Sequence, residues 1–352
     1  MTMTEHRRAL HQIPETGWDV KETAQYIKTV LQGLSCQVFS PVENAVCAYF
    51  DFGGEHTVAF RSDMDALPLT ETTGLAFSSR HPGRMHACGH DGHMAILLGL
   101  AEYVSGQKEL GENVLLIFQP AEETTGGAKP LCETGVLEKY RVRRIYGLHL
   151  WPALEKGVVG SCAGAMMSRS CELSIEIGGR SAHIARWQKG RDALYAGVLL
   201  LGRFYETVEG EPCVLRFGRM DSGSVRNAVS DRTVLEGSLR TLDDEMYEDL
   251  TEEIGRICQD VAEETGCHIT ARQTSGYPPV TNDPSLLRQA RERIRITRVE
   301  PTFITEDFSH YQRHVPGVFF WLGTGGTALH RPDFDFDEDL LNVGLDLFKA
   351  LL

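Results

Sequence analysis

Two adjacent glutamates, Glu122 and Glu123, follow an apolar run and a short turn, where a pair of carboxylates can do chemistry. Some thirty residues upstream lies a run rich in metal-binding side chains, His86-Ala-Cys-Gly-His-Asp-Gly-His93. Some thirty residues downstream, another apolar stretch ends in His149. One carboxylate of the pair could bind a metal ion while its neighbour transfers protons. That division of labour is what metal-assisted hydrolysis requires.

Cys88 and His90 place a thiolate and an imidazole two residues apart, on one side of an extended segment. Alone, this pair is equally typical of a buried cysteine beside a helix cap. Glu123, His149 and His330, each expected after a strand, favour a metal site instead. Five such groups exceed the four ligands of one tetrahedral zinc ion, which favours two metals with one bridging ligand. Ligand softness fits Zn²⁺, with Mn²⁺, Co²⁺ and Ni²⁺ as alternatives.

Glu122 is the candidate catalytic group, although two successive glutamates usually face solvent. The constrained sequence around the pair favours the functional interpretation. Asp65, which follows a predicted strand, could orient a histidine ligand through its carboxylate, or could simply cap a turn. His93 is a weaker ligand candidate than His90. The pair Glu306 and Asp307 is more simply explained as the start of a helix.

Composition limits the classes of partner. The chain has 352 residues, of which 35 are basic and 49 acidic, and its net charge of −14 argues against nucleic acid or an anionic membrane as a partner. Nine cysteines without a tight spacing framework indicate a reducing, cytoplasmic protein. The N-terminal residues show no apolar signal region, and no apolar run is long enough to span a bilayer.

The order of expected elements predicts an α/β protein. Strands are expected at 57–61, 114–118, 144–149 and 317–322, and a helix is expected at 91–104. This alternation predicts a mostly parallel sheet with helices on both faces, and ligands collect at the carboxyl ends of such strands. From about residue 171 the pattern changes to strict alternation, which is typical of antiparallel strands. We therefore expect a domain formed by 1–169 and 276–352, with an α+β insert at 170–275.

Several motifs together resemble the M20 metallopeptidase family, in its amidohydrolase branch. That branch includes N-acyl-amino-acid deacylases, hippurate hydrolases, indole-acetyl-amino-acid hydrolases and N-acetyl-diaminopimelate deacetylases. The motifs occur in the family's order along nearly the whole chain; they include Arg61-Ser-Asp-Met-Asp-Ala-Leu-Pro68, His86-Ala-Cys-Gly-His-Asp-Gly-His93, Gln119-Pro-Ala-Glu-Glu123, Gly147-Leu-His149 and Leu329-His-Arg-Pro-Asp-Phe334.

The resemblance implies a role for each matching residue. Cys88 would bridge two metal ions, and the remaining metal ligands would be His90, Glu123, His149 and His330. Glu122 would be the general base, with Asp65 as a supporting carboxylate. The insert would be a lid and dimerisation domain, in which three residues would bind substrate or polarise its carbonyl, often across a homodimer: His183, Asn227 and Arg240. The chain departs from the family where Trp187-Gln188 replaces a Pro-His pair and where Ser230 replaces a proline.

These inferences predict a dinuclear metal-dependent amidohydrolase that cleaves the amide bond of a small N-acyl amino acid. A dipeptidase or carboxypeptidase is the nearest alternative, because the bond is the same and only the pockets differ. A non-catalytic binding module is a further alternative, against which Glu122 argues, since binding alone needs no base. The acyl group, the amino acid, the native metal and the oligomeric state stay open.

Overall fold

The computed structural model describes residues 1–274 and 276–352, which form two compact units. The first unit consists of Met1–Gly164, Thr281–Glu300 and Asp307–Leu352, and the second of Ala165–Val280 and Pro301–Glu306. The return of Pro301–Glu306 to the second unit was not expected. The boundary expected at residue 275 lies outside the described residues.

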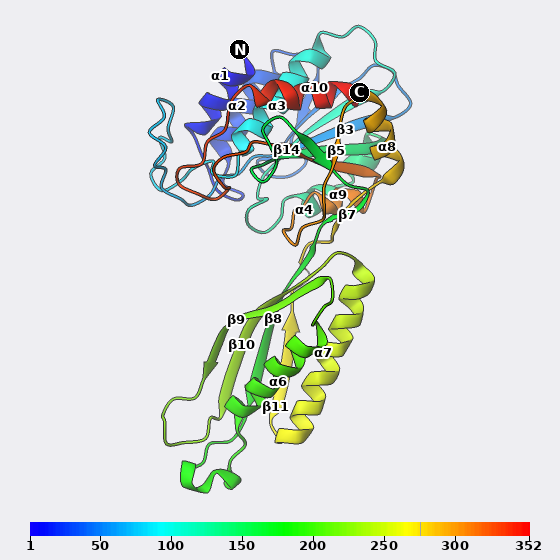
Figure 1. Cartoon of the computed structure of the whole chain (residues 1–352). Coiled ribbons are helices and arrows are strands. Elements are labelled where there is room, and N and C mark those ends of the chain that lie inside the picture. Colours follow the sequence, from blue (N-terminus) through cyan, green and yellow to red (C-terminus); the bar gives the residue numbers. More distant parts are fainter. Residues whose placement is uncertain (275) are drawn as a thin grey trace. The chain divides into compact units, whose positions relative to one another are not determined.

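The first unit is built on an eight-stranded sheet with the order β1-β2-β4-β3-β5-β14-β6-β13 (Figure 1). Its four central strands, β4-β3-β5-β14, are mutually parallel. Every residue of β3, β4 and β14 is buried, as expected for parallel strands covered on both faces. The strands are β1 (Gln37–Phe39), β2 (Val46–Phe50), β3 (Thr57–Asp63), β4 (Asn113–Gln119), β5 (Val142–Trp151), β6 (Val159–Ser161), β13 (Thr297–Arg298) and β14 (Gly317–Gly323).

Helices cover both faces of this sheet, which confirms the predicted fold class. One face packs into a large apolar core with α1 (Met3–His11), α2 (Lys21–Leu31), α3 (His90–Ser105), α8 (Pro284–Arg293) and α10 (Leu340–Ala350). The other face carries α4 (Ala128–Glu133), α5 (Val136–Lys139) and α9 (Ser309–Gln312). None of the described helices is both long and apolar enough to cross a membrane.

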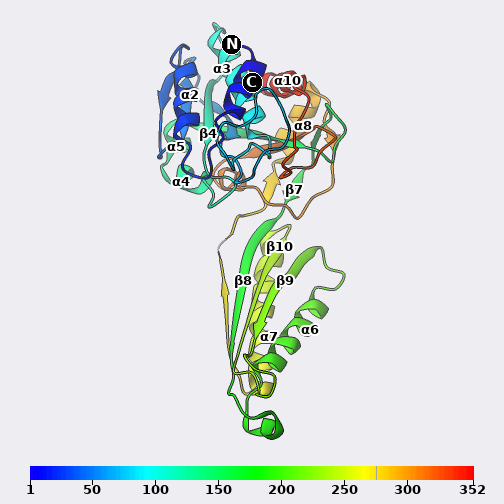
Figure 2. The ribbon, with the colours of Figure 1, turned by 90° about the vertical axis from the view of Figure 1, so that its left-hand side faces the viewer.

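The second unit is a four-stranded antiparallel sheet, with the order β11-β8-β10-β9, that packs against two helices (Figure 2). Strand β8 alternates buried apolar with more exposed polar residues, so its apolar side faces the helices. Asp192 and Asp243 cap the two helices by accepting hydrogen bonds from their first backbone N–H groups. The elements are β8 (Arg169–Gly178), β9 (Cys213–Ser222), β10 (Arg232–Thr241), β11 (His268–Gln273), a 3₁₀ turn (Ile184–Lys189), α6 (Ala193–Thr207) and α7 (Asp244–Thr265). Two short strands, β7 (Gly164–Met167) and β12 (Val280–Asn282), contain two of the four boundaries between the units.

Candidate metal centre

The carboxyl ends of the central strands hold the predicted site. Strand β4 ends at Gln119, and Glu122 and Glu123 begin the turn that follows. Directly before that turn, Ala121 has a φ of 62°, a left-handed conformation that is uncommon for a residue other than glycine. The backbone N–H groups of Glu122 and Glu123 donate to the two carboxylate oxygens of Asp65, at 2.9 and 3.1 Å. Asp65 therefore fixes the backbone from which both glutamate side chains project.

Cys88 and His90 lie at the start of α3, on either side of Gly89. This glycine has a φ of 85°, and a Cβ atom there would lie 2.7 Å from Cδ1 of Leu150. Both the backbone conformation and the packing therefore require glycine between the two candidate ligands. From the other end of the chain, the His330 N–H donates to the Ala87 carbonyl at 2.8 Å, which places its ring beside Cys88.

The five predicted ligands come together in one cluster. The Cys88 Sγ atom lies 3.4 Å from His149 Nε2 and 3.3 Å from His330 Nε2. The Glu123 Oε1 atom lies 3.4 Å from His330 Nε2 and 3.7 Å from His90 Nε2. Among the described residues, His90 Nε2 and Glu123 Oε1 are buried and have no hydrogen-bond partner. Buried polar atoms without a partner are costly, so this donor set fits a bound cation.

The second nitrogen of two of these rings is fixed by the backbone. His90 Nδ1 donates to the Asp65 carbonyl, and His149 Nδ1 donates to the Leu150 carbonyl, both at 2.7 Å. A proton on Nδ1 leaves the lone pair on Nε2, the atom that faces the cluster in each ring. The structure thus favours the tautomer that a metal ligand requires. The two roles considered for Asp65 were to orient a histidine and to cap a turn. Its main-chain carbonyl accepts from His90, and its carboxylate, with Oδ1 at 3.9 Å from His90 Nδ1, accepts the N–H groups of both glutamates.

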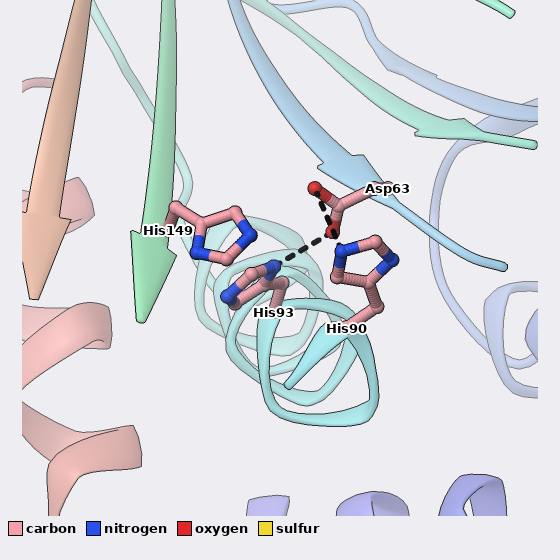
Figure 3. A group of neighbouring side chains, drawn as sticks. All are labelled: Asp63, His90, His93 and His149. Carbon is pink, nitrogen blue, oxygen red and sulfur yellow. Dashed lines mark hydrogen bonds and ion pairs between the residues drawn. The ribbon is translucent and has the colours of Figure 1, made fainter. Parts of the chain in front are cut away.

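Figure 3 shows a second group, formed by Asp63, His90, His93 and His149, which shares two histidines with the predicted ligands. His93 Nδ1 donates to Asp63 Oδ1 at 2.7 Å, and His93 Nε2 accepts from the Leu150 N–H at 2.9 Å. Both nitrogens of His93 are therefore engaged, and His93 supports the site without offering a ligand atom. Asp63 Oδ2 lies 3.7 Å from His90 Nε2, so this buried carboxylate adds negative charge beside the ligands.

The charges of the cluster also favour a cation. Burial raises the pKa of the Cys88 thiol well above its usual range, and the carboxylates of Glu123 and Glu122 raise it further. Burial also acts to raise the pKa of Glu123, but the interactions with the His330 and His90 rings outweigh it and lower the pKa to about 2. The thiol thus needs a nearby cation to ionise, and a bound divalent metal favours the thiolate in this way.

The predicted substrate-binding residues all lie in the second unit, at two different places. His183 and Asn227 are neighbours, because the Ile184 N–H donates to the Asn227 carbonyl at 3.0 Å. Arg240 lies near the far end of β10, where its Nη1 donates to Thr305 Oγ1 at 3.2 Å. A strand rises about 3.3 Å per residue, so the eight steps from Arg232 to Arg240 span roughly 26 Å. The second unit of a single chain therefore cannot bring the side chains of His183, Asn227 and Arg240 to the same small molecule.

Comparison with known proteins decides the family. Residues 59–352 match the peptidase family M20/M25/M40. The chain belongs to this family. It is 34% identical to an N-acetyldiaminopimelate deacetylase of Streptococcus uberis, over 98% of this chain and 96% of the relative. It is 32% identical to an N-acetyldiaminopimelate deacetylase of Limosilactobacillus fermentum, over 98% and 95%.

A solved structure supports the same assignment for this M20 protein. A Bacillus subtilis protein described as a dinuclear metal-binding peptidase of the M20 family superposes with a TM-score of 0.90. It is 31% identical, and the match covers 99% of this chain and 96% of that one. The family resemblance inferred from the motifs is therefore confirmed, and the family includes a dinuclear metal-binding member.

Sequence reasoning missed two buried charges of this M20 chain. Arg61 and Asp63 lie on β3 and are almost fully buried, and neither was assigned a role from the sequence. Arg61 Nη1 donates to Asp63 Oδ2 at 2.8 Å. Burial acts to raise the pKa of Asp63, but His90, His93 and Arg61 outweigh it and hold that pKa well below its usual range. The available signal was an arginine and an aspartate two residues apart, and therefore on the same side, at the end of a strand that begins with an apolar run.

Proposed function

We propose that this chain hydrolyses the amide bond of a small N-acyl amino acid at a dinuclear metal centre, with Glu122 as general base. The ligands would be Cys88, His90, Glu123, His149 and His330. One observation carries the proposal: two adjacent glutamates on one fixed backbone both reach the cluster. Glu123 presents a buried oxygen to the cysteine and histidines, and Glu122 has an oxygen within 4.8 Å of ligand atoms of both His90 and Glu123.

In this proposal, bound metal ions would polarise the scissile carbonyl and lower the pKa of a water molecule. The Glu122 carboxylate would accept the proton of that water and then deliver it to the leaving nitrogen. Asp65 would prevent the glutamates from moving, because it accepts both of their N–H groups. Replacing Glu122 by glutamine tests the assignment, since it removes the base and no ligand. Full activity in that variant would refute it.

We propose Zn²⁺ or Mn²⁺ as the native metal, with Co²⁺ and Ni²⁺ also able to bind. One thiolate and three imidazoles favour Zn²⁺, while two carboxylates nearby suit Mn²⁺. The test is elemental analysis of protein purified without added metal, followed by activity after reconstitution with each ion.

The substrate we propose to test first is N-acetyl-diaminopimelate, which the names of the two curated relatives suggest. A panel should also contain hippurate, other N-acyl amino acids, dipeptides and longer peptides. Preference for an acyl amino acid would support the deacylase proposal, whereas preference for dipeptides would favour a dipeptidase of the same family. Binding without turnover of any compound would favour a non-catalytic binding module.

We further propose that the second unit is a lid and dimerisation domain, through which two copies of the chain form a homodimer. Helix α6 exposes three apolar side chains: Leu194, Tyr195 and Val198 are 46%, 52% and 54% exposed. Strand β9 is an edge of the sheet, and an unpaired edge can pair with a second copy. Light scattering tests the dimer, and Val198→Glu should weaken it.

The distance between Arg240 and the pair His183 and Asn227 suggests how the substrate contacts are divided between the two subunits. Arg240 would anchor a carboxylate in its own subunit, and His183 and Asn227 would reach the site of the partner. A mixture of His183→Ala and Glu122→Gln proteins should then recover activity, because one site of each mixed dimer has both residues. No recovery in proven mixed dimers would contradict this arrangement. All nine cysteines are free thiols, which supports a cytoplasmic location as part of the proposal.

A further inference from the structure

The loop that carries the two glutamates, residues 120–127, is closed tightly at its base. A Cβ atom at Gly127 would lie 1.9 Å from the Pro120 carbonyl oxygen, so only glycine allows the two ends to approach this closely. Inside the loop, the Gly126 N–H donates to the Ala121 carbonyl at 2.9 Å. The position of Glu122 and Glu123 therefore depends on what holds the two ends together.

One carboxylate oxygen contacts both residues that flank this loop. Asp307 Oδ2 accepts from Gln119 Nε2 at 2.7 Å, directly before the loop, and from the Ala128 N–H at 3.0 Å, directly after it. Asp307 is fully buried. These contacts join the end of β4 to the start of α4 and leave the loop between them projecting as one unit.

Arg61 supports this carboxylate from the next strand. Its Nη2 donates to Asp307 Oδ1 at 2.7 Å, and its Nε donates to Gln119 Oε1 at 2.9 Å. The Tyr311 hydroxyl also donates to Gln119 Oε1, at 3.1 Å. Through Nη1, the same guanidinium holds Asp63, whose other oxygen accepts from His93. The loop base and the surroundings of the histidine ligands are thus joined through one buried arginine.

We propose that Asp307 is a positioning residue, whose carboxylate holds the loop ends together and so determines where Glu122 and Glu123 meet the metal ions. Asp65 holds the middle of the loop, and Asp307 holds its base. The inference rests on the proposed roles of the two glutamates. It extends them to a residue outside the five proposed ligands, whose two oxygens accept hydrogen bonds from Arg61, Gln119 and Ala128.

Asp307→Asn is the direct test, because asparagine keeps the shape but must place an amino group against one set of donors. We expect kcat at saturating metal to fall about 10- to 10²-fold, as for other residues that orient metal ligands, with a much smaller change in KM. Zn²⁺ affinity, measured by competition with a chelator, should fall as well. Gln119→Met, which removes the same link from the other side, should act in the same direction if Asp307→Asn fails to fold.

Asn282→Ala is the matched control for a purely structural lesion. Asn282 is buried in the same unit but bonds to Ser161, Cys162 and Phe319. The Asn282→Ala variant should have a lower Tm, while its kcat per metal-loaded site should stay at the wild-type value. Wild-type kcat and Zn²⁺ affinity in both Asp307→Asn and Gln119→Met would overturn the inference. An active Glu122→Gln would instead overturn the proposed function, so the two failures can be told apart.

Discussion

Replacing Asp65 by asparagine should slow amide hydrolysis at saturating metal by about 10- to 10²-fold. The two Asp65 oxygens each accept one backbone N–H, from Glu122 and from Glu123. Asparagine offers one oxygen, and its amino group would face the second N–H. At least one hydrogen bond to a charged acceptor is therefore lost, and the backbone of one glutamate is released.

The magnitude follows from that single loss. A hydrogen bond to a charged group contributes about 1.5–3 kcal/mol. Each 1.4 kcal/mol in an activation free energy corresponds to about a tenfold change in rate. If the released loop must be reordered in each transition state, the cost appears in kcat. If the cost appears only in the free energy of unfolding, Tm falls and kcat per folded molecule does not.

The assay is steady-state hydrolysis of the best acyl amino acid, with metal content and Tm measured on the same samples. Asp283→Asn is the matched control, since Asp283 also accepts two backbone N–H groups, at the start of α8, where asparagine is an equally good cap. It should leave kcat unchanged. A kcat for Asp65→Asn equal to that of this control would refute the reasoning.

Other substitutions test separate roles. Glu122→Gln should reduce turnover by at least about 10²–10⁴-fold while bound metal, measured by elemental analysis, stays near wild type; loss of metal would make Glu122 a ligand instead. Cys88→Ala should lose metal and activity together, and unchanged stoichiometry after dialysis would exclude Cys88 as a ligand. Arg240→Ala should lower kcat/KM for free-acid substrates far more than for their carboxamides, through loss of a two-pronged hydrogen bond to the carboxylate. Equal losses on both would show that Arg240 binds something else.

Local sequence was enough to predict the fold class and the identity of the candidate ligands. The apolar runs in β3, β4 and β14 are typical of parallel strands buried on both faces, and every residue of the three strands is buried. Glu123 and His330 follow such strands, Cys88 and His90 lie at the start of α3, and all four meet at one edge of the sheet. The physical link from sequence to site is therefore short for these residues.

Asp307 shows where local sequence stops being informative. Its neighbours along the chain made it resemble the start of a helix, and α9 does begin two residues later. Its partners are Arg61, which is 246 residues away, and Gln119, which is 188 residues away. Nothing near Asp307 in the sequence indicates these contacts. Likewise, the placement of Asn227 before the start of β10 and of Arg240 near its end depends on the length and register of the sheet.

The sequence alone therefore determined which chemistry is available: thiolate, imidazole and carboxylate groups at the ends of buried strands, with a spare glutamate for proton transfer. Only the tertiary structure decided how those groups are held. The hydrogen bonds made by the side chains of Asp65, Arg61 and Asp307 join segments that are distant in the sequence. Burial strengthens these bonds because it removes water. The physical reason is that side-chain type is a local property, whereas desolvation and pairing of buried charges arise only when the segments pack together.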